Sequence, residues 1–94
     1  MIDIKQEIVA IVHRHLPGCK IFLYGSRARG THAEGADFDI ALDAGSRIPP
    51  EIFSSIESAI EDSDIYTNVD VVDLHRISES FLHAIKKDLV LWTK

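Results

Sequence analysis

A short apolar segment that runs directly into a Gly-Ser turn limits the possible folds of this chain more than any other feature. Residues 20–24 read KIFLY, which is too short and too rich in β-branched and aromatic residues for a helix, so they predict a mostly buried strand. Residues 37–42 read DFDIAL and alternate polar with apolar side chains. This alternation predicts a half-buried strand with Asp37, Asp39 and Ala41 on its polar face. The two strands must be joined by a connection that contains GSRARG, two arginines among small residues.

Helical periodicity precedes and follows this pair of strands. Apolar residues recur at helical spacing from Ile4 to Leu16, and Asp3 is spaced from Gln6 as in a capping box. The dipeptide Pro17-Gly18 is expected to end this first helix. A second helix is predicted to begin at Pro49-Pro50, because proline fits the first helical turn.

The last third of the chain predicts one more strand and one more helix. Residues 69–74 read VDVVDL, whose β-branched content favours a strand. Ser78 is typical of an N-cap, and the core face of the helix after it is predicted to carry Phe81, Leu82, Ile85 and Leu89. Strands that alternate with helices predict an α/β fold, a short mixed sheet packed with helices. With 94 residues in total, the sequence predicts a single domain spanning residues 1–94.

Composition narrows the classes of function. The formal net charge of −5 argues against a broad phosphate-binding face for DNA or RNA, so nucleic acid is not an expected partner. No apolar run approaches the ~20 residues of a membrane span. The N-terminal segment lacks the pattern of a signal peptide, and the single cysteine, Cys19, is interpreted as a buried thiol. These features predict a cytoplasmic protein with no membrane partner.

Two short motifs contain residues that are suited to bind a cation and a phosphate. Side chains two apart in a strand project to one face, ~7 Å apart, so Asp37 and Asp39 can converge on one cation. Ligation by oxygen alone favours Mg²⁺ or Mn²⁺ over zinc. Gly25 and Ser26 begin a turn that can bind a phosphate through backbone N–H groups and a hydroxyl. Either arginine of GSRARG could add positive charge there, and Arg29 is preferred over Arg27.

A third carboxylate is expected from the segment VDVVDL. Asp70 and Asp73 are separated by an odd number of residues, so they lie on opposite faces of one strand. Only one of them can face the site. Asp70 is selected because apolar residues flank it within the strand, whereas Asp73 lies at the strand end and can cap a loop. His32, in the loop between the two motifs, is interpreted as an exposed loop residue.

Taken together, these pieces resemble the minimal nucleotidyltransferases of the DNA polymerase β superfamily. The resemblance lies in Tyr24-Gly25-Ser26, in Asp37-Phe38-Asp39-Ile40 and in Val69-Asp70-Val71, and it spans nearly the whole chain. The form GSRARG is common in this family. Ala36 is a departure, since members often carry a serine before the first acid, and it puts the local turn geometry in doubt.

The resemblance implies transfer of AMP from ATP to an acceptor hydroxyl. By this resemblance Asp37 and Asp39 hold two Mg²⁺ ions, which Mn²⁺ can replace. Asp70 binds one of the ions and helps to deprotonate the acceptor. The implied metal-binding and catalytic residues are Asp37, Asp39 and Asp70, and the implied nucleotide-binding residues are Gly25, Ser26 and Arg29.

The resemblance also implies a protein partner. Members of this size are paired with a small helical protein of the HEPN type, and in some pairs the transferase adenylylates a tyrosine of a toxin and so acts as its antitoxin. A contact through the apolar C-terminal residues Leu89, Leu91 and Trp92 is expected. The alternative is a non-catalytic antitoxin that acts by direct contact, although its expected signature is the loss of one of the acids. A polymerase or tailing enzyme is disfavoured because the chain lacks a basic groove.

Overall fold

A computed structural model describes residues 2–31 and 33–93 of the chain. The chain forms, in order, α1 (Ile4–His15), β1 (Lys20–Tyr24), α2 (Gly25–Arg29), β2 (Phe38–Asp43), α3 (Pro50–Glu61), β3 (Val69–Asp73), α4 (Glu79–Lys86) and β4 (Val90–Leu91). All predicted helices and strands are present. The connection after β1, which contains GSRARG, is the short helix α2. Strand β4 is an addition that the pattern did not predict.

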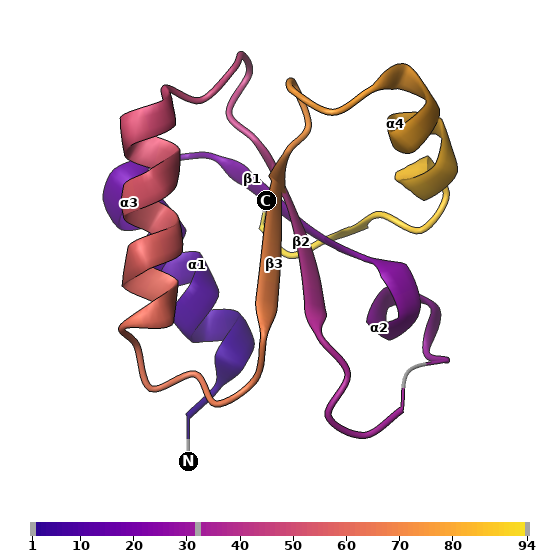
Figure 1. The fold of residues 1–94 in the computed structure, drawn as a ribbon, viewed down its shortest axis with the longest axis horizontal. Helices are drawn as coiled ribbons and strands as arrows, with labels where there is room; N and C mark the ends of the chain where they lie inside the picture. The colour runs from indigo at the N-terminus through magenta and orange to yellow at the C-terminus, as the bar shows by residue number, and fades with distance from the viewer. Residues whose placement is uncertain (1, 32, 94) are drawn as a thin grey trace.

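The four strands form one mixed sheet in the order β3-β2-β1-β4, which confirms the predicted fold class. Strand β1 is antiparallel to both of its neighbours, whereas β2 and β3 are parallel. Figure 1 shows the sheet between two layers, with α1 and α3 on one side and α2 and α4 on the other. Strands β3 and β4 therefore form the two edges of the sheet.

The main core lies between the sheet and the layer of α1 and α3. Its fully buried side chains come from both helices and from the central strands, and include Ile8, Ile11, Val12, Ile21, Ile40, Leu42 and Ile56. Helix α1 begins as predicted, with the Asp3 carboxylate accepting a hydrogen bond from Gln6 N at 3.1 Å. Cys19 is buried as predicted, and burial is the main cause that raises the pKa of its thiol to about 11.

A smaller cluster fills the other face of the sheet, under α4. It contains Tyr24, Ala41 and Ile85. Ala41 lies on the same face of β2 as Asp39, as predicted, but it is completely buried there, so this face of the strand is not polar along its whole length. The polar face of β2 is therefore open only at the beginning of the strand, around Asp39, and helix α4 covers the rest.

The C-terminal region differs from the sequence interpretation in two respects. Phe81 was expected in the core but is 38% exposed, and its ring contacts that of Tyr24 edge-on at 6.1 Å between centroids. Trp92 packs against the main core and lies edge-on to Phe38, so it is not part of an exposed apolar patch. Of the predicted contact residues, only Leu91 is exposed, because Leu89 is half-buried beside the smaller cluster.

Within residues 2–31 and 33–93, none of the helices combines the length and the apolar character that crossing a lipid bilayer requires.

Candidate active site

The sequence-predicted site residues meet at one end of the sheet. Tyr24, the last residue of β1, is the antiparallel partner of Asp39 in β2. Asp39 is in turn the parallel partner of Asp70 in β3. Directly paired residues of neighbouring strands project to the same face, with ~4.8 Å between the strands. The register therefore places three polar side chains in one row across the sheet, on the face that α2 and α4 cover further along.

The two paired acids differ in burial. Asp39 is half-buried, whereas Asp70 is exposed. Burial is the largest cause that raises the pKa of Asp39, followed by the negative charges of Asp70 and then Asp37, while Arg29 opposes them. Asp37 thus belongs electrostatically to the same group, although it lies just before β2. The arrangement disfavours the ionised form of Asp39 unless positive charge is brought to it.

Gly25 is required by the position of Asp39. It follows Tyr24 directly with φ of +76°, in the left-handed region that favours glycine. A Cβ atom at this position would overlap Asp39 Oδ2 and lie 3.2 Å from Asp39 Cγ. From the sequence, Gly25 is expected to begin a turn that binds a phosphate through backbone N–H groups. The structure adds a second reason, since only glycine lets the turn pack against the Asp39 carboxylate.

Ser26 lies in the first turn of α2, directly after this contact. Its side chain is half-buried and makes no hydrogen bond with any part of the chain that the structure describes. Its carbonyl oxygen accepts a hydrogen bond from Thr31 N at 3.0 Å, which closes the short helix. The hydroxyl is therefore available for a ligand, and the turn itself is fixed.

The two arginines of GSRARG have different positions. Arg27 Nε donates to the carbonyl oxygen of Ala36 at 2.9 Å, and its guanidinium stacks 3.9 Å from the centroid of Phe38. Arg27 thereby holds the loop between α2 and β2. Arg29 pairs with Asp88 at 2.9 Å, and its positive charge partly counteracts the rise in the pKa of Asp39. This placement favours Arg29 over Arg27 as the cation that faces the site.

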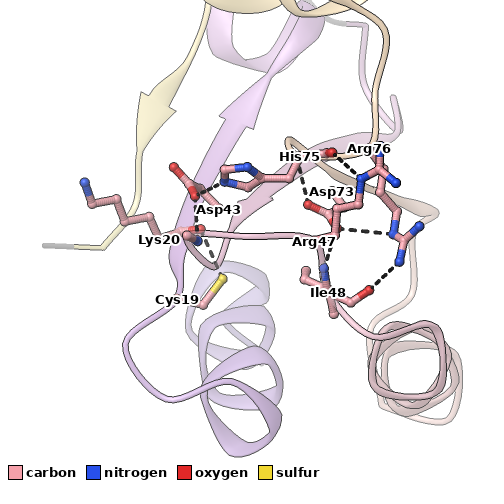
Figure 2. A network of polar contacts seen from close by, with 9 residues as sticks. Cys19, Lys20, Asp43, Arg47, Ile48, Asp73, His75 and Arg76 are labelled. Atoms are coloured by element: carbon pink, nitrogen blue, oxygen red, sulfur yellow. Dashed lines mark hydrogen bonds and ion pairs between the residues drawn. The ribbon is translucent and has the colours of Figure 1, made fainter.

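Asp70 and Asp73 lie on opposite faces of β3, as expected. Asp73 is only 3% exposed, and its two oxygens accept hydrogen bonds from Ile48 N at 2.8 Å and His75 N at 2.9 Å. Arg76 lies 3.6 Å from the same carboxylate. Figure 2 shows this carboxylate between the loop after β2 and the loop after β3. Asp73 therefore fastens two loops together at the far end of the sheet.

Two residues near the site were not selected from the sequence. Burial raises the pKa of Tyr24 to about 12, with Asp39 and Asp70 as further causes, so its phenol stays protonated beside the acids. The sequence feature that could have identified Tyr24 as a site residue is its position directly before Gly25. Nothing in the sequence indicated Asp88, because it lies after α4 and contacts Arg29 only in the folded protein. His32 lies outside the described residues.

The acids fit a cation that takes part of its ligands from elsewhere. Across residues 2–31 and 33–93, no three His, Cys, Asp or Glu side chains are grouped closely enough to hold a metal ion by themselves. Mg²⁺ typically binds through one or two carboxylates, with water and substrate phosphates completing the octahedron. Asp39 and Asp70 on adjacent strands match that requirement, as they offer only hard oxygen ligands.

Comparison with known proteins identifies the family. Residues 6–94 match the family model described as "Polymerase beta, Nucleotidyltransferase". The chain belongs to this nucleotidyltransferase family. The family resemblance deduced from the motifs is thereby confirmed.

Individual relatives agree with this assignment. The chain is 30% identical over 94 residues to the protein named "Probable protein adenylyltransferase MntA" of Haemophilus influenzae (strain ATCC 51907 / DSM 11121 / KW20 / Rd), covering 96% of this chain and 82% of the relative. The fold is similar to a crystal structure of a toxin-antitoxin with AMP-PNP, with a TM-score of 0.70 and 23% identity over 95% of this chain and 72% of the other. It is also similar to a mutant of the toxin-antitoxin MntA-HpeT, with a TM-score of 0.68 and 19% identity over 95% and 71% of the two chains.

Proposed function

We propose that this chain transfers AMP from ATP to a tyrosine hydroxyl of a HEPN-type toxin partner and so acts as its antitoxin. The observation that carries the proposal is the pairing of Asp39 with Asp70 across adjacent strands, with Gly25 packed against Asp39. The similarity to an adenylyltransferase and to a toxin-antitoxin that binds an ATP analogue supports the choice of nucleotide and partner.

In this proposal the triphosphate lies over the start of α2. Ser26 supplies a free hydroxyl and Arg29 supplies positive charge close to Asp39. Backbone N–H groups at the beginning of a helical turn also favour a phosphate. These contacts would orient the α-phosphate toward Asp70, so that attack and departure occur in line.

The acids divide the remaining tasks. Asp37, Asp39 and Asp70 would hold Mg²⁺, two ions by the family resemblance. When bound, Mg²⁺ supplies charge stabilisation to the attacking and leaving oxygens of the displacement. Asp70 is exposed and thus accessible to an acceptor, whose hydroxyl proton it would accept as the new O–P bond forms and pyrophosphate leaves. Tyr24, held neutral, would limit the negative charge next to Asp39.

Co-expression with the product of the adjacent gene tests this function. After incubation with ATP and Mg²⁺, intact-mass analysis should show one or more AMP units on the partner. The same experiment with the variant Asp39→Asn should show none. A tight complex that gains no mass with the unchanged chain would contradict the transferase and support an antitoxin that acts by contact alone.

A further inference from the structure

The outer edge of β3 is open for pairing. Phe38 N donates to the carbonyl oxygen of Asn68 at 3.0 Å, and Leu74 N donates to that of Leu42 at 2.9 Å. Hydrogen bonds in a parallel pair recur at every second residue, so the groups of Val69 and Val71 point away from β2. Among the described residues, no hydrogen bond uses the N–H or C=O of either valine. The edge therefore offers unpaired backbone groups to an added strand.

A groove runs along this edge between β3 and helix α3. One hollow of about 420 Å³ is lined by apolar residues such as Ile60, Val69 and Val71 and by polar residues that include Glu57 and Glu61. A second hollow of about 390 Å³ is lined by apolar residues that include Phe53, Val72 and Ile77. Glu57 of α3 lines both hollows, so they adjoin. We call this surface the β3–α3 groove.

The register connects the open edge to the candidate active site. In an added strand of either direction, the residue opposite Asp70 projects to the same face as Asp70 and Asp39, at the ~4.8 Å spacing of neighbouring strands. Its two chain neighbours project to the other face, where Val69 and Val71 line the first hollow. A single extended segment can therefore place one side chain beside Asp70 and its neighbours in the groove.

Charge indicates the character of such a segment. Glu57 and Glu61 line the first hollow, are exposed and form no ion pair within the described part of the chain. Among the described residues that line the two hollows, Arg76 of the second hollow is the one cation, and it lies 3.6 Å from the Asp73 carboxylate. A segment with a basic side chain fits this groove better than an acidic one.

We propose that an extended segment of the partner, bearing the acceptor hydroxyl and a basic residue, adds to β3 as a fifth strand and brings the hydroxyl to Asp70. This proposal rests on the proposed transfer to a protein partner. Main-chain hydrogen bonds to the β3 edge give affinity in such strand addition, and the hollows select side chains. The other edge is less suited, since β4 has only two residues.

Amide hydrogen exchange tests the docking without relying on transfer. It is measured by NMR on the chain alone and on its complex with the co-expressed partner. Exchange at Val69 and Val71 should slow by at least ~10-fold in the complex, because their outward N–H groups become paired. Unchanged exchange at both residues in a stable complex would overturn the proposal, as would failure to form a complex. Slow exchange in the chain alone that depends on its concentration would assign the edge to a second copy.

Proline variants at the two sheet edges test delivery of the acceptor. Val69→Pro removes an outward N–H at the first position of a strand, where proline is tolerated, and keeps the bonds to β2. Leu91→Pro is the matched control, because Trp92 N donates to Ile21 and the N–H of Leu91 therefore points away from β1. AMP transfer to the partner should fall by at least ~10-fold in Val69→Pro and by clearly less in Leu91→Pro, which probes the C-terminal contact expected from the sequence. The reverse pattern would overturn the proposal.

Charge reversal gives an independent check. Glu57→Arg should lower transfer, whereas Glu51→Arg, on the same helix but outside both hollows, should not. Titration with AMP-PNP and Mg²⁺ should give equal affinity for all these variants, which shows that the nucleotide site is intact. If the unchanged chain transfers no AMP, the proposed function fails, and hydrogen exchange alone then decides the docking. If it transfers AMP and both Val69→Pro and Glu57→Arg do so equally, the docking fails and the function stands.

Discussion

Strands β2 and β3 carry acids at both ends, and the two ends differ in what surrounds the carboxylates. At the beginning of the strands, Asp39 faces Asp70 and the pKa of Asp39 is raised. At the other end, hydrogen bonds from His75 and from Gly45 N lower the pKa of Asp43. Asp73 there has N–H donors for both of its oxygens. Within residues 2–31 and 33–93, these strands thus hold one group of acids whose side chains accept no hydrogen bond and one group whose side chains do.

The acids at one end of the strands therefore contribute to stability, and those at the other end are suited to bind a ligand. A carboxylate that accepts several hydrogen bonds in the folded state stabilises the fold and has little capacity left for a ligand. A carboxylate beside other carboxylates destabilises the fold until a cation arrives. Substitutions at the two ends should therefore have opposite consequences for stability and for AMP transfer.

The largest effect is expected for Asp39→Asn. Charge stabilisation by a bound metal is worth several kcal/mol, so transfer of AMP should fall by ~10³-fold or more. The free energy of unfolding should stay equal or rise, since a repelling charge is removed. Intact-mass time courses and urea denaturation measure the two quantities. An active variant would show that the acids at this end are not the site.

Asp70→Asn should lower AMP transfer and not stability, whereas Asp73→Asn should lower stability and not AMP transfer. Loss of a general base costs ~10²- to 10⁴-fold in rate, so Asp70→Asn should lose transfer and keep its stability. Asp73→Asn should keep transfer in the folded protein and lose ~1–3 kcal/mol in free energy of unfolding, because a buried donor is left without its acceptor. Should Asp73 prove essential for transfer and Asp70 dispensable, the faces of β3 would be assigned wrongly.

Gly25→Ala should disturb the site more than the rest of the fold. A side chain at φ of +76° is strained, which costs ~1 kcal/mol, and the new Cβ displaces the Asp39 carboxylate. We expect a large loss of transfer with a drop of ~1–2 kcal/mol in free energy of unfolding. Gly30→Ala is a suitable control, since Gly30 has similar φ but open space around it. Equal transfer by both variants would remove the proposed role of the contact with Asp39.

The smallest effect concerns Asp43 and pH. The folded pKa of Asp43 lies below its ordinary value of 3.8, so its stabilisation is present above about that pH and is lost as the pH falls through the folded pKa. The pair with His75 is partly exposed, and screening limits the effect to ~0.5 kcal/mol. Asp43→Asn should be less stable than the unchanged chain at pH 6, and the difference should shrink as the pH falls below 3.8. A difference that does not shrink with falling pH would have another cause.

Much of the fold follows from local patterns. The helices and the first three strands were predictable because their apolar periodicity and caps, such as Asp3, are local signals. Strand β4 was not, because two exposed residues carry no periodicity and only pairing with β1 makes them a strand. The burial of Ala41 also depends on α4, which lies far along the chain.

Part of the arrangement of the candidate site could also be predicted from the sequence. The odd separation of Asp70 and Asp73 predicted that only one of them faces the site, and the structure brings Asp70 into register with Asp39. The salt bridge of Arg29 with Asp88 could not be predicted, as it joins residues of α2 and the segment after α4. Nor could the contact of Gly25 with Asp39, which depends on how closely α2 packs on the sheet.

Titration with Mn²⁺ in the presence of AMP-PNP tests the contrast between the two ends most directly. The measurement compares the unchanged chain with Asp39→Asn and Asp73→Asn by calorimetry, after the free energy of unfolding of each has been determined without metal. The account predicts that Asp39→Asn loses Mn²⁺ binding with equal or higher stability, while Asp73→Asn is less stable and binds Mn²⁺ as before. Unchanged binding by Asp39→Asn, or its loss by a folded Asp73→Asn, would contradict the account.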